Sequence, residues 1–178
     1  MDKINGVTCI KGEVHNIMTL LRLNTRWAAP ARFSGELLIQ NESPLIRSFR
    51  RLNERLEGIY DLRSVDCVSY LLPFHQVIIS EHASGPLTST ALSSLSKFVL
   101  YGFLSPHFLR AREGINLIAS AIPMCKFEET DWESDEVIFM KLLELSALCL
   151  QCDSSQLLKV SVAWDIFNTC SSIHSQYR

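Results

Sequence analysis

The sequence predicts an all-α protein, a right-handed stack of about six to eight helices like those of armadillo or HEAT repeat proteins. Apolar residues recur at helical spacing through most of the 178 residues, and Ser-Pro and Gly-Pro dipeptides separate the segments. The one β-branched run, 77–79, is short and lies in a helical frame. Several segments carry apolar residues on more than one side, which is typical of helices covered by two neighbours. No clean repeat of ~40 residues is visible, so a compact helical bundle is the alternative.

The first third of the chain predicts two helices. The first is expected over about 8–24, with one apolar face made of Ile10, Val14, Ile17, Met18 and Leu21. A polar loop with proline and glycine follows over 28–42. Ser43 and Pro44 are then typical of an N-cap and a first helical residue. The apolar positions of this second helix are Leu45, Phe49, Leu52, Leu56 and Tyr60.

The middle of the chain predicts a broken helix and two further ones. Pro73 lies inside the apolar run 65–80, and a proline there predicts a short helix, a kink and a second piece. Gly85-Pro86 opens the next helix, which carries Leu87, Ala91, Leu95, Phe98 and Val99, and Gly102 is well placed to end it. Ser105-Pro106 is expected to start another, with Phe108, Ile115, Ile118 and Ile122 inward.

The stretch 130–143 predicts a sharply capped helix. Thr130 and Glu133 fit a capping box, with Ser134 as a second candidate cap, and carboxylates in the first turns suit the helix dipole. The inward stripe is expected at Val137, Met140, Leu143 and Leu148. A last helix should run from about 154 to the end, burying Leu157, Val160, Ala163, Phe167 and Cys170.

Composition restricts the class of function. Hydrophobic residues make up 47% and charged residues 20%, and the formal charge is −2, so one folded domain over 1–178 is expected and nucleic acid is not an expected partner. No apolar run is long enough for a transmembrane helix, and residues 1–10 lack the layout of a signal peptide. These features predict a cytosolic protein.

No motif predicts catalysis or a cofactor. The glycines are isolated, and no phosphate loop, nucleophile elbow or paired cysteine motif is present. Cys149 and Cys152 form a lone C-x-x-C, and without further ligands free thiols are favoured over a zinc or redox site. The function is therefore expected in the surfaces of the helical scaffold.

Three blocks together resemble the N-terminal region of the large Arf guanine-nucleotide exchange factors. The first, 13–27, ends in Arg22, Asn24, Arg26 and Trp27; the second is LPFHQVIISEHASGPLTSTALSSLSKF over 72–98; the third is KFEETDWESDEVIFMKLL over 126–143. Their order and spacing agree over nearly the whole chain. The residues at the end of the first block and the Ser-Asp-Glu-Val motif of the third favour the Golgi brefeldin A-resistance branch, with its fungal Gea and plant GNOM relatives, over the trans-Golgi BIG branch.

The matched region of that family is the dimerisation and cyclophilin-binding domain, an armadillo-like unit. The resemblance implies a regulatory fragment without the exchange domain, ending before the last helices of this region, and therefore no enzyme activity of its own. It also implies a homodimer and contact with the following helical domain. A small GTPase of the Arf, Arl or Rab type and cyclophilin are further partners that it suggests. The full protein would sit peripherally on Golgi or ER-Golgi intermediate membranes.

The resemblance places candidate dimer-interface residues at Lys97 and Glu136. An exposed pair of this kind is worth only about 0–1 kcal/mol, so the charges would set register more than strength. Arg26 and Trp27 are candidates for anchoring the first helix to the stack. His75 stands where relatives often have leucine, and a position at a helix edge is favoured over a lineage-specific surface.

The leading hypothesis is a non-catalytic, self-associating regulatory module of a Golgi Arf exchange factor. The alternative is a standalone helical adaptor that binds a small GTPase or a peptide. The sequence that follows this segment in the natural gene product distinguishes them, because an exchange domain there supports the first and a true stop codon the second.

Overall fold

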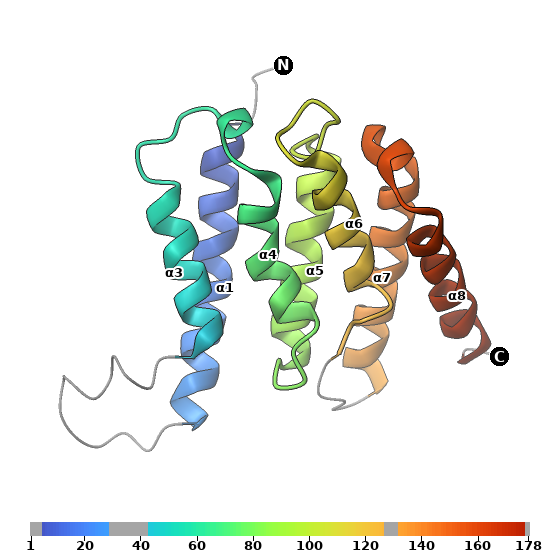
Figure 1. Ribbon diagram of the computed structural model, residues 1–178. Helices are drawn as coiled ribbons and strands as arrows, with labels where there is room; N and C mark the ends of the chain where they lie inside the picture. Colours follow the sequence, from blue (N-terminus) through green and yellow to red (C-terminus); the bar gives the residue numbers. More distant parts are fainter. Residues whose placement is uncertain (1–4, 29–42, 127–131, 177–178) are drawn as a thin grey trace.

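The computed structural model describes residues 5–28, 43–126 and 132–176, with the side chains of 24–28, 132–134 and 176 outside the description. The helices stand side by side in an extended stack of two layers (Figure 1). One layer contains α1 (Gly6–Ala28), α5 (Gly85–Leu100) and α7 (Trp132–Gln151). The other contains α3 (Pro44–Arg55), α4 (Cys67–Ile78), α6 (Ala111–Ala121) and α8 (Val160–Gln176). The described residues form no strand, so the prediction of an all-α helical stack is confirmed.

The core is a single apolar seam that runs between the two layers. At its centre, Phe74 of α4 meets Phe49 of α3 and Phe98 of α5 edge to face, with ring centroids 5.0 and 5.2 Å apart. Such edge-to-face pairs add to the free energy gained from burial of the rings. These three helices are therefore locked together by one line of aromatic side chains, each fully buried.

Most of the predicted apolar faces are the buried ones. In α1 the side chains of Ile10, Val14, Ile17 and Leu21 are buried, and Leu87, Ala91, Leu95, Phe98 and Val99 are buried in α5. Gly102 follows α5 with a φ of 72°, the left-handed conformation that suits glycine at a helix end. Pro44 and Gly85 begin their helices as predicted, although neither Ser43 nor Ser84 makes a side-chain cap bond.

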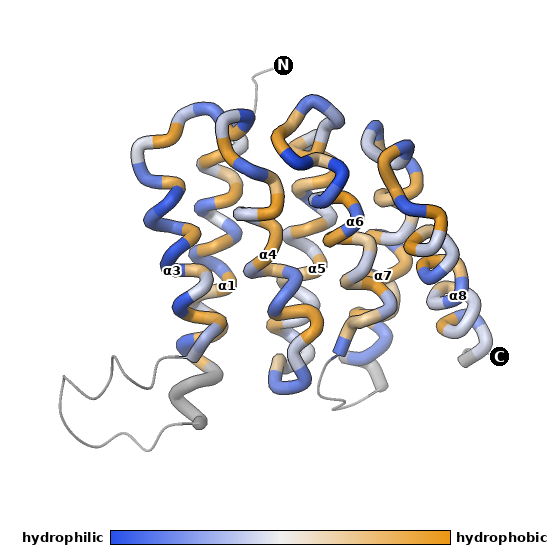
Figure 2. Tube along the Cα trace, in the orientation of Figure 1, coloured by the Kyte–Doolittle hydropathy of each residue, from blue (hydrophilic) through white to orange (hydrophobic). Residues whose placement is uncertain are grey.

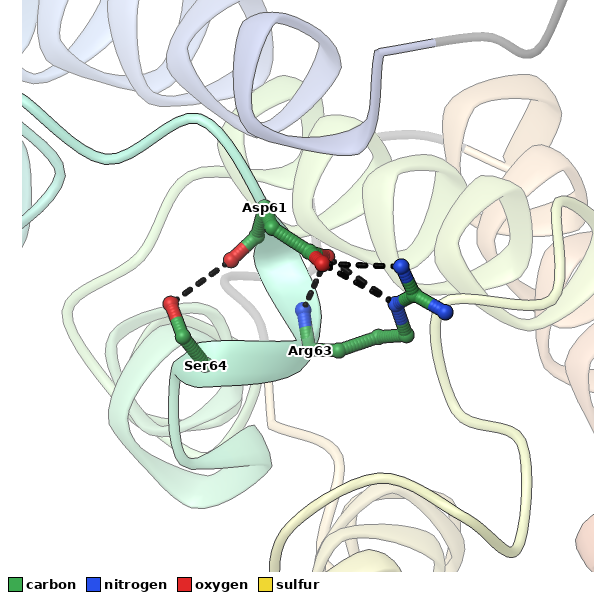
Figure 3. Close-up of polar contacts among 3 residues, drawn as sticks. All are labelled: Asp61, Arg63 and Ser64. Atoms are coloured by element: carbon green, nitrogen blue, oxygen red, sulfur yellow. Dashed lines mark hydrogen bonds and ion pairs between the residues drawn. The ribbon is translucent and has the colours of Figure 1, made fainter.

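The joint between α3 and α4 is a short 3₁₀ helix, η1 (Leu62–Ser64), closed by its own side chains (Figure 3). The Asp61 carboxylate accepts hydrogen bonds from the backbone N–H and the guanidinium of Arg63, at 3.0 and 2.9 Å. The Ser64 hydroxyl donates to the Asp61 carbonyl oxygen at 2.7 Å. Tyr60, predicted on the apolar face of α3, lies beyond the end of that helix and is 88% exposed.

Two predicted boundaries in the middle of the chain are wrong. Pro73 does not divide α4, which runs without a break from Cys67 to Ile78. A proline removes one backbone hydrogen bond, and α4 is held by packing against α3, α5 and α6. Ser105-Pro106 does not start a helix either. Residues 105–110 form turns, and α6 begins at Ala111, because Arg110 has a left-handed backbone with a φ of 59° that a helix cannot contain. The Leu109 carbonyl accepts the Cys67 N–H and Arg110 pairs with Asp66, and both contacts hold these turns against the start of α4.

The predicted phase of α7 is wrong for two of its four residues. Val137 and Met140 are exposed, whereas Leu143 and Leu148 are partly buried against the core. The buried apolar positions are Ile138, Leu142, Leu145 and Cys149. Both sets obey helical spacing, and packing against α5, α6 and α8 selects the second. The Thr130 capping box lies outside the described residues. Ser134 is already inside the helix, so it is not the cap.

The last segment begins later than predicted. Residues 153–157 form the 3₁₀ helix η2 (Asp153–Leu157), and α8 starts at Val160. The Ser154 hydroxyl donates to the Leu104 carbonyl, which fixes η2 against the turn after α5. In α8 the buried residues are Ile166 and Ile173, while Val160 and Phe167, predicted inward, are exposed.

Candidate interaction surfaces

Lys97 lies in a polar cluster that joins α5 to α1. Its Nζ donates to Glu13 Oε1 at 2.7 Å, and the Ser94 hydroxyl donates to Glu13 Oε2 at 2.7 Å. Glu13 is 8% exposed, so both oxygens need partners, and the cluster supplies them. The hydrogen bond to Glu13 raises the pKa of the Lys97 amine, so Lys97 stays charged at neutral pH.

Lys97 nevertheless reaches the surface. Its side chain is 43% exposed, and an ammonium group has three N–H donors, of which Glu13 uses one. The predicted interface role of Lys97 thus competes with its ion pair to Glu13 in the same chain, which the sequence did not predict. Glu13 is 84 residues away in the chain, so no local motif indicated the pairing.

Glu136 is exposed in the first turns of α7. Ile138 of α7 lies against Gly85 at the start of α5. Since successive residues turn by about 100° round the axis, Glu136 points roughly opposite to Ile138, away from α5. Lys97 faces α1 instead. Within one chain the structure therefore separates the two predicted interface residues.

The second predicted pair cannot be placed. Arg26 and Trp27 belong to the last turn of α1, but their side chains lie outside the described residues. Their proposed role as an anchor of α1 stays a prediction.

An exposed apolar face on α8 was not predicted. Val160, Trp164 and Phe167 repeat at i, i+4 and i+7 and are 87, 63 and 61% exposed. The rings of Trp164 and Phe167 stack with centroids 5.5 Å apart. α8 stands at one end of the stack, beside α6 and α7 (Figure 1). The sequence prediction assigned Val160 and Phe167 to the core, because sequence periodicity does not distinguish a core face from an exposed apolar one.

His75 is buried on α4, 7% exposed, rather than at an exposed helix edge. Its Nε2 lies 3.2 Å from the hydroxyl of Ser120 on α6. That hydroxyl donates to the Leu117 carbonyl, so its oxygen accepts the Nε2–H of the imidazole. Burial lowers the pKa of His75, which favours the neutral ring. This histidine links two helices and is not a surface marker.

The six cysteines are free thiols. No group of three or more His, Cys, Asp or Glu side chains among the described residues gathers at metal-binding distance. Cys149 of the C-x-x-C pair is buried, and burial raises the pKa of its thiol to about 12. A thiol of that kind is inert at neutral pH.

A groove between α3 and α4 was missed as well. It is lined by arginines of α3 and by α4, and α3 is a predominantly hydrophilic helix (Figure 2). The signal was present in the sequence as arginines at 47, 51 and 55, four residues apart. Only the position of α4 in the structure shows that these three arginines line one groove.

The described residues thus form a two-layer α-helical stack with open surfaces. No helix among them is long and apolar enough to span a bilayer. No protein-family model matches the chain.

Known proteins resemble the chain along nearly its whole length. It is 30% identical over 168 residues to the ARF guanine-nucleotide exchange factor GNL1 of Arabidopsis thaliana, covering 94% of this chain and 11% of that protein. It is 32% identical over 173 residues to GNL2 of the same plant, covering 96% and 12%. The Golgi-specific brefeldin A-resistance guanine nucleotide exchange factor 1 homolog of Caenorhabditis elegans is 29% identical over 170 residues, covering 95% and 8%.

The chain is thus homologous to one segment of the large Arf guanine-nucleotide exchange factors, as the three sequence blocks predicted. It spans about a tenth of the length of these relatives.

Proposed function

We propose that this chain is a non-catalytic regulatory module of a Golgi Arf guanine-nucleotide exchange factor. It would control self-association, contact with the following helical domain, and recruitment to Golgi or ER-Golgi intermediate membranes in vesicle transport. The observation that supports this most is the homology itself: nearly all of the chain matches about a tenth of each exchange factor. Detectable acceleration of nucleotide exchange on Arf by this chain would contradict the non-catalytic part.

The surface of the stack supports a role in assembly. In a helical stack each repeat is covered by its neighbours, and an end repeat needs a polar outer face to remain soluble alone. The α8 face of Val160, Trp164 and Phe167 is apolar instead. We propose that the next helical segment of the exchange factor covers this face. This arrangement would bring the module and the following domain into one regulatory unit.

For self-association we propose a two-fold dimer in which Glu136 of each copy meets Lys97 of the other. A two-fold axis makes the same contact twice, which suits a pair whose members are separated within one chain. The free donors of Lys97 and the exposed position of Glu136 support the proposal. Since such pairs contribute little energy, exposed apolar residues near Glu136, such as Met140, would supply most of the affinity.

The test is the molar mass of the chain in solution by light scattering, over a range of protein concentrations. We expect a dimer that Lys97→Ala and Glu136→Ala each weaken, and that the double variant weakens further. Glu13→Gln is the matched control, because it removes the intramolecular partner of Lys97 and leaves Lys97 in place.

Two outcomes would remove this pair from the interface. One is a double variant that keeps the full dimer while circular dichroism shows a folded chain. The other is a loss of dimer in Glu13→Gln equal to that in Lys97→Ala, which would mean that Lys97 acts only through α1.

The alternative function is a standalone adaptor that binds a small GTPase or a peptide. The arginine-lined groove favours a peptide within that alternative. Transcript sequence beyond this segment decides between the two, because an exchange domain downstream would contradict the adaptor.

A further inference from the structure

A groove with a volume of about 720 Å³ lies between α3 and α4. One wall is α3, the first helix of its layer, and the other is the N-terminal and middle part of α4. The groove contains neither Lys97 nor Glu136 nor any residue of α8, so it is a separate surface from those discussed above.

The α3 wall is cationic and regular. Arg47, Arg51 and Arg55 recur every four residues and all three are exposed, so their positions rise by about 6 Å from one to the next. Arg55 donates to the Ser69 hydroxyl at 3.2 Å. The guanidinium groups of Arg47 and Arg51 make no hydrogen bond or ion pair with any described residue. Two guanidinium groups with free donors thus stand side by side at the edge of the hollow.

The charge of the lining is not neutralised from within. The fourth arginine, Arg110, pairs with Asp66 at 3.0 Å, and Asp66 is the one acidic residue among those that line the groove. Four arginines against one carboxylate leave a formal charge of +3, in a chain whose formal charge is −2. A groove with this lining attracts negatively charged groups.

The α4 wall has the same period but a different chemistry. Val68, Leu72 and Gln76 line it, again four residues apart, and Leu72 is 39% exposed although it is a large apolar side chain. One wall thus presents cations and the other a partly apolar strip, each repeating at one helical turn.

We propose that this groove binds an acidic amphipathic helix of a partner protein. Carboxylates at every fourth position of that helix would pair with Arg47, Arg51 and Arg55, since a guanidinium binds a carboxylate through two parallel N–H donors. Apolar residues on the adjoining side of the helix would cover Leu72. The recognition is of the helix-in-groove kind, with affinity from the apolar strip and register from the charges.

A helix fits the groove better than a membrane surface does. Leu72, the exposed large apolar residue here, lines the groove together with the arginines. The four-residue repeat on both walls also matches the repeat of a helix, whereas a bilayer of anionic lipids presents no such spacing. The proposal does not depend on self-association of the chain.

The experiment measures binding of the whole chain to a fluorescent helical peptide by anisotropy. The probe is a 16-residue alanine-based peptide with glutamates every four residues on one side and leucines on the adjoining side. A peptide of the same composition with the glutamates spread round the helix is its control. We expect binding to the first peptide at least tenfold tighter than to the second, and weaker as salt is raised from about 50 to 300 mM.

Variants of the chain locate the site. Arg47→Gln with Arg51→Gln should weaken binding tenfold or more, and Leu72→Ser several-fold. Arg112→Gln, which removes an exposed arginine of α6 outside the groove, should change it less than twofold. The variant with Arg47→Glu and Arg51→Glu should no longer bind the acidic peptide. It should instead bind a peptide that has lysines in place of the glutamates. A purely structural role of these arginines would not produce this reversal of specificity.

Four results would overturn the proposal. The first is no binding of the patterned peptide at low salt. The second is equal binding of the two peptides, and the third is equal loss in the Arg112→Gln variant. The fourth is binding of the chain to phosphatidylserine vesicles, abolished by the Arg47 and Arg51 changes, with no binding of the peptide; the surface would then be a membrane site. Thermal unfolding of each variant by circular dichroism verifies that the chain remains folded.

Discussion

Several buried polar side chains form hydrogen bonds between neighbouring elements of this stack. The Tyr70 hydroxyl donates to the Phe103 carbonyl, Glu13 ties Ser94 and Lys97 of α5 to α1, and His75 meets Ser120 between α4 and α6. Each places a hydrogen-bonding atom where water is excluded. Loss of one partner leaves the other unsatisfied, at a cost of about 1–3 kcal/mol.

His75 makes the stability of the fold depend on pH. Burial lowers its pKa in the folded chain below the value of about 6.5 in the unfolded chain, so below pH 6.5 the unfolded state binds more protons. Stability from this residue is complete above pH 6.5 and is lost as the pH falls through the folded pKa. The loss is at most about 1.4 kcal/mol per pH unit. Urea unfolding at pH 7.5, 6 and 5 measures it.

His75→Leu should flatten this pH dependence, since Ser120 keeps its hydrogen bond to Leu117. An unchanged slope in His75→Leu would mean that other groups set the acid sensitivity.

At the scale of elements, close approach of α4 and α6 depends on a glycine. A Cβ on Gly114 would lie 2.7 Å from Leu104 Cδ1, 3.0 Å from Cys67 Cβ and 3.2 Å from Leu71 Cδ1. The nearest atoms belong to buried residues, which have little room to move. Gly114 therefore allows α4 and α6 to approach more closely than a residue with a side chain would.

Gly114→Ala should destabilise the chain by about 1–3 kcal/mol, because overpacking outweighs the gain in helix propensity. Gly12→Ala in α1 is the matched control: its Cβ would meet nothing within 4 Å, so a gain of about 0.5–1 kcal/mol is expected. Chemical denaturation of both variants measures the difference. Equal shifts of the same sign would show that α6 can move away from α4 at no cost.

The elements also show how far the sequence alone could go. It placed the buried faces of α1 and α5 correctly, because the apolar residues that it assigned to them are buried or partly buried in the structure. In α7 and α8 two stripes compete, and the wrong one was chosen in each: Met140 and Phe167 are exposed, while Leu142 and Ile166 are buried. Periodicity gives the spacing of a buried face, but its phase on a two-sided helix depends on where the neighbours stand.

At the scale of the whole molecule, the stack behaves as a chain of neighbouring contacts. α4 packs against helices on three sides, whereas α8 contacts α6 and α7 at one end. Stability should therefore be highest at the centre, around Phe74, and lowest at α8. Local opening of α8 would alter the apolar face of Trp164 and Phe167 without unfolding the rest.

Hydrogen exchange followed by mass spectrometry tests this gradient. Phe74→Ala, expected to cost about 3–5 kcal/mol, should speed exchange throughout α3, α4 and α5. Ile173→Ala, at the buried side of α8, should speed exchange in α8 and leave α4 within error of the unchanged chain. Equal acceleration everywhere in both variants would mean that the stack unfolds as one unit.

The sequence by itself determined the helical class, the starts of α3 and α5, and the homology to Arf exchange factors, because apolar spacing, the signals at Ser43-Pro44 and Gly85-Pro86, and short sequence motifs are properties of short stretches. Only the tertiary structure decided which face of α7 and α8 is buried, that Lys97 is held by Glu13, and that Arg47 and Arg51 line a groove with Leu72. The reason is physical: each of these depends on a neighbour distant in the chain, and a local pattern records the period of a helix but not the neighbour that covers it.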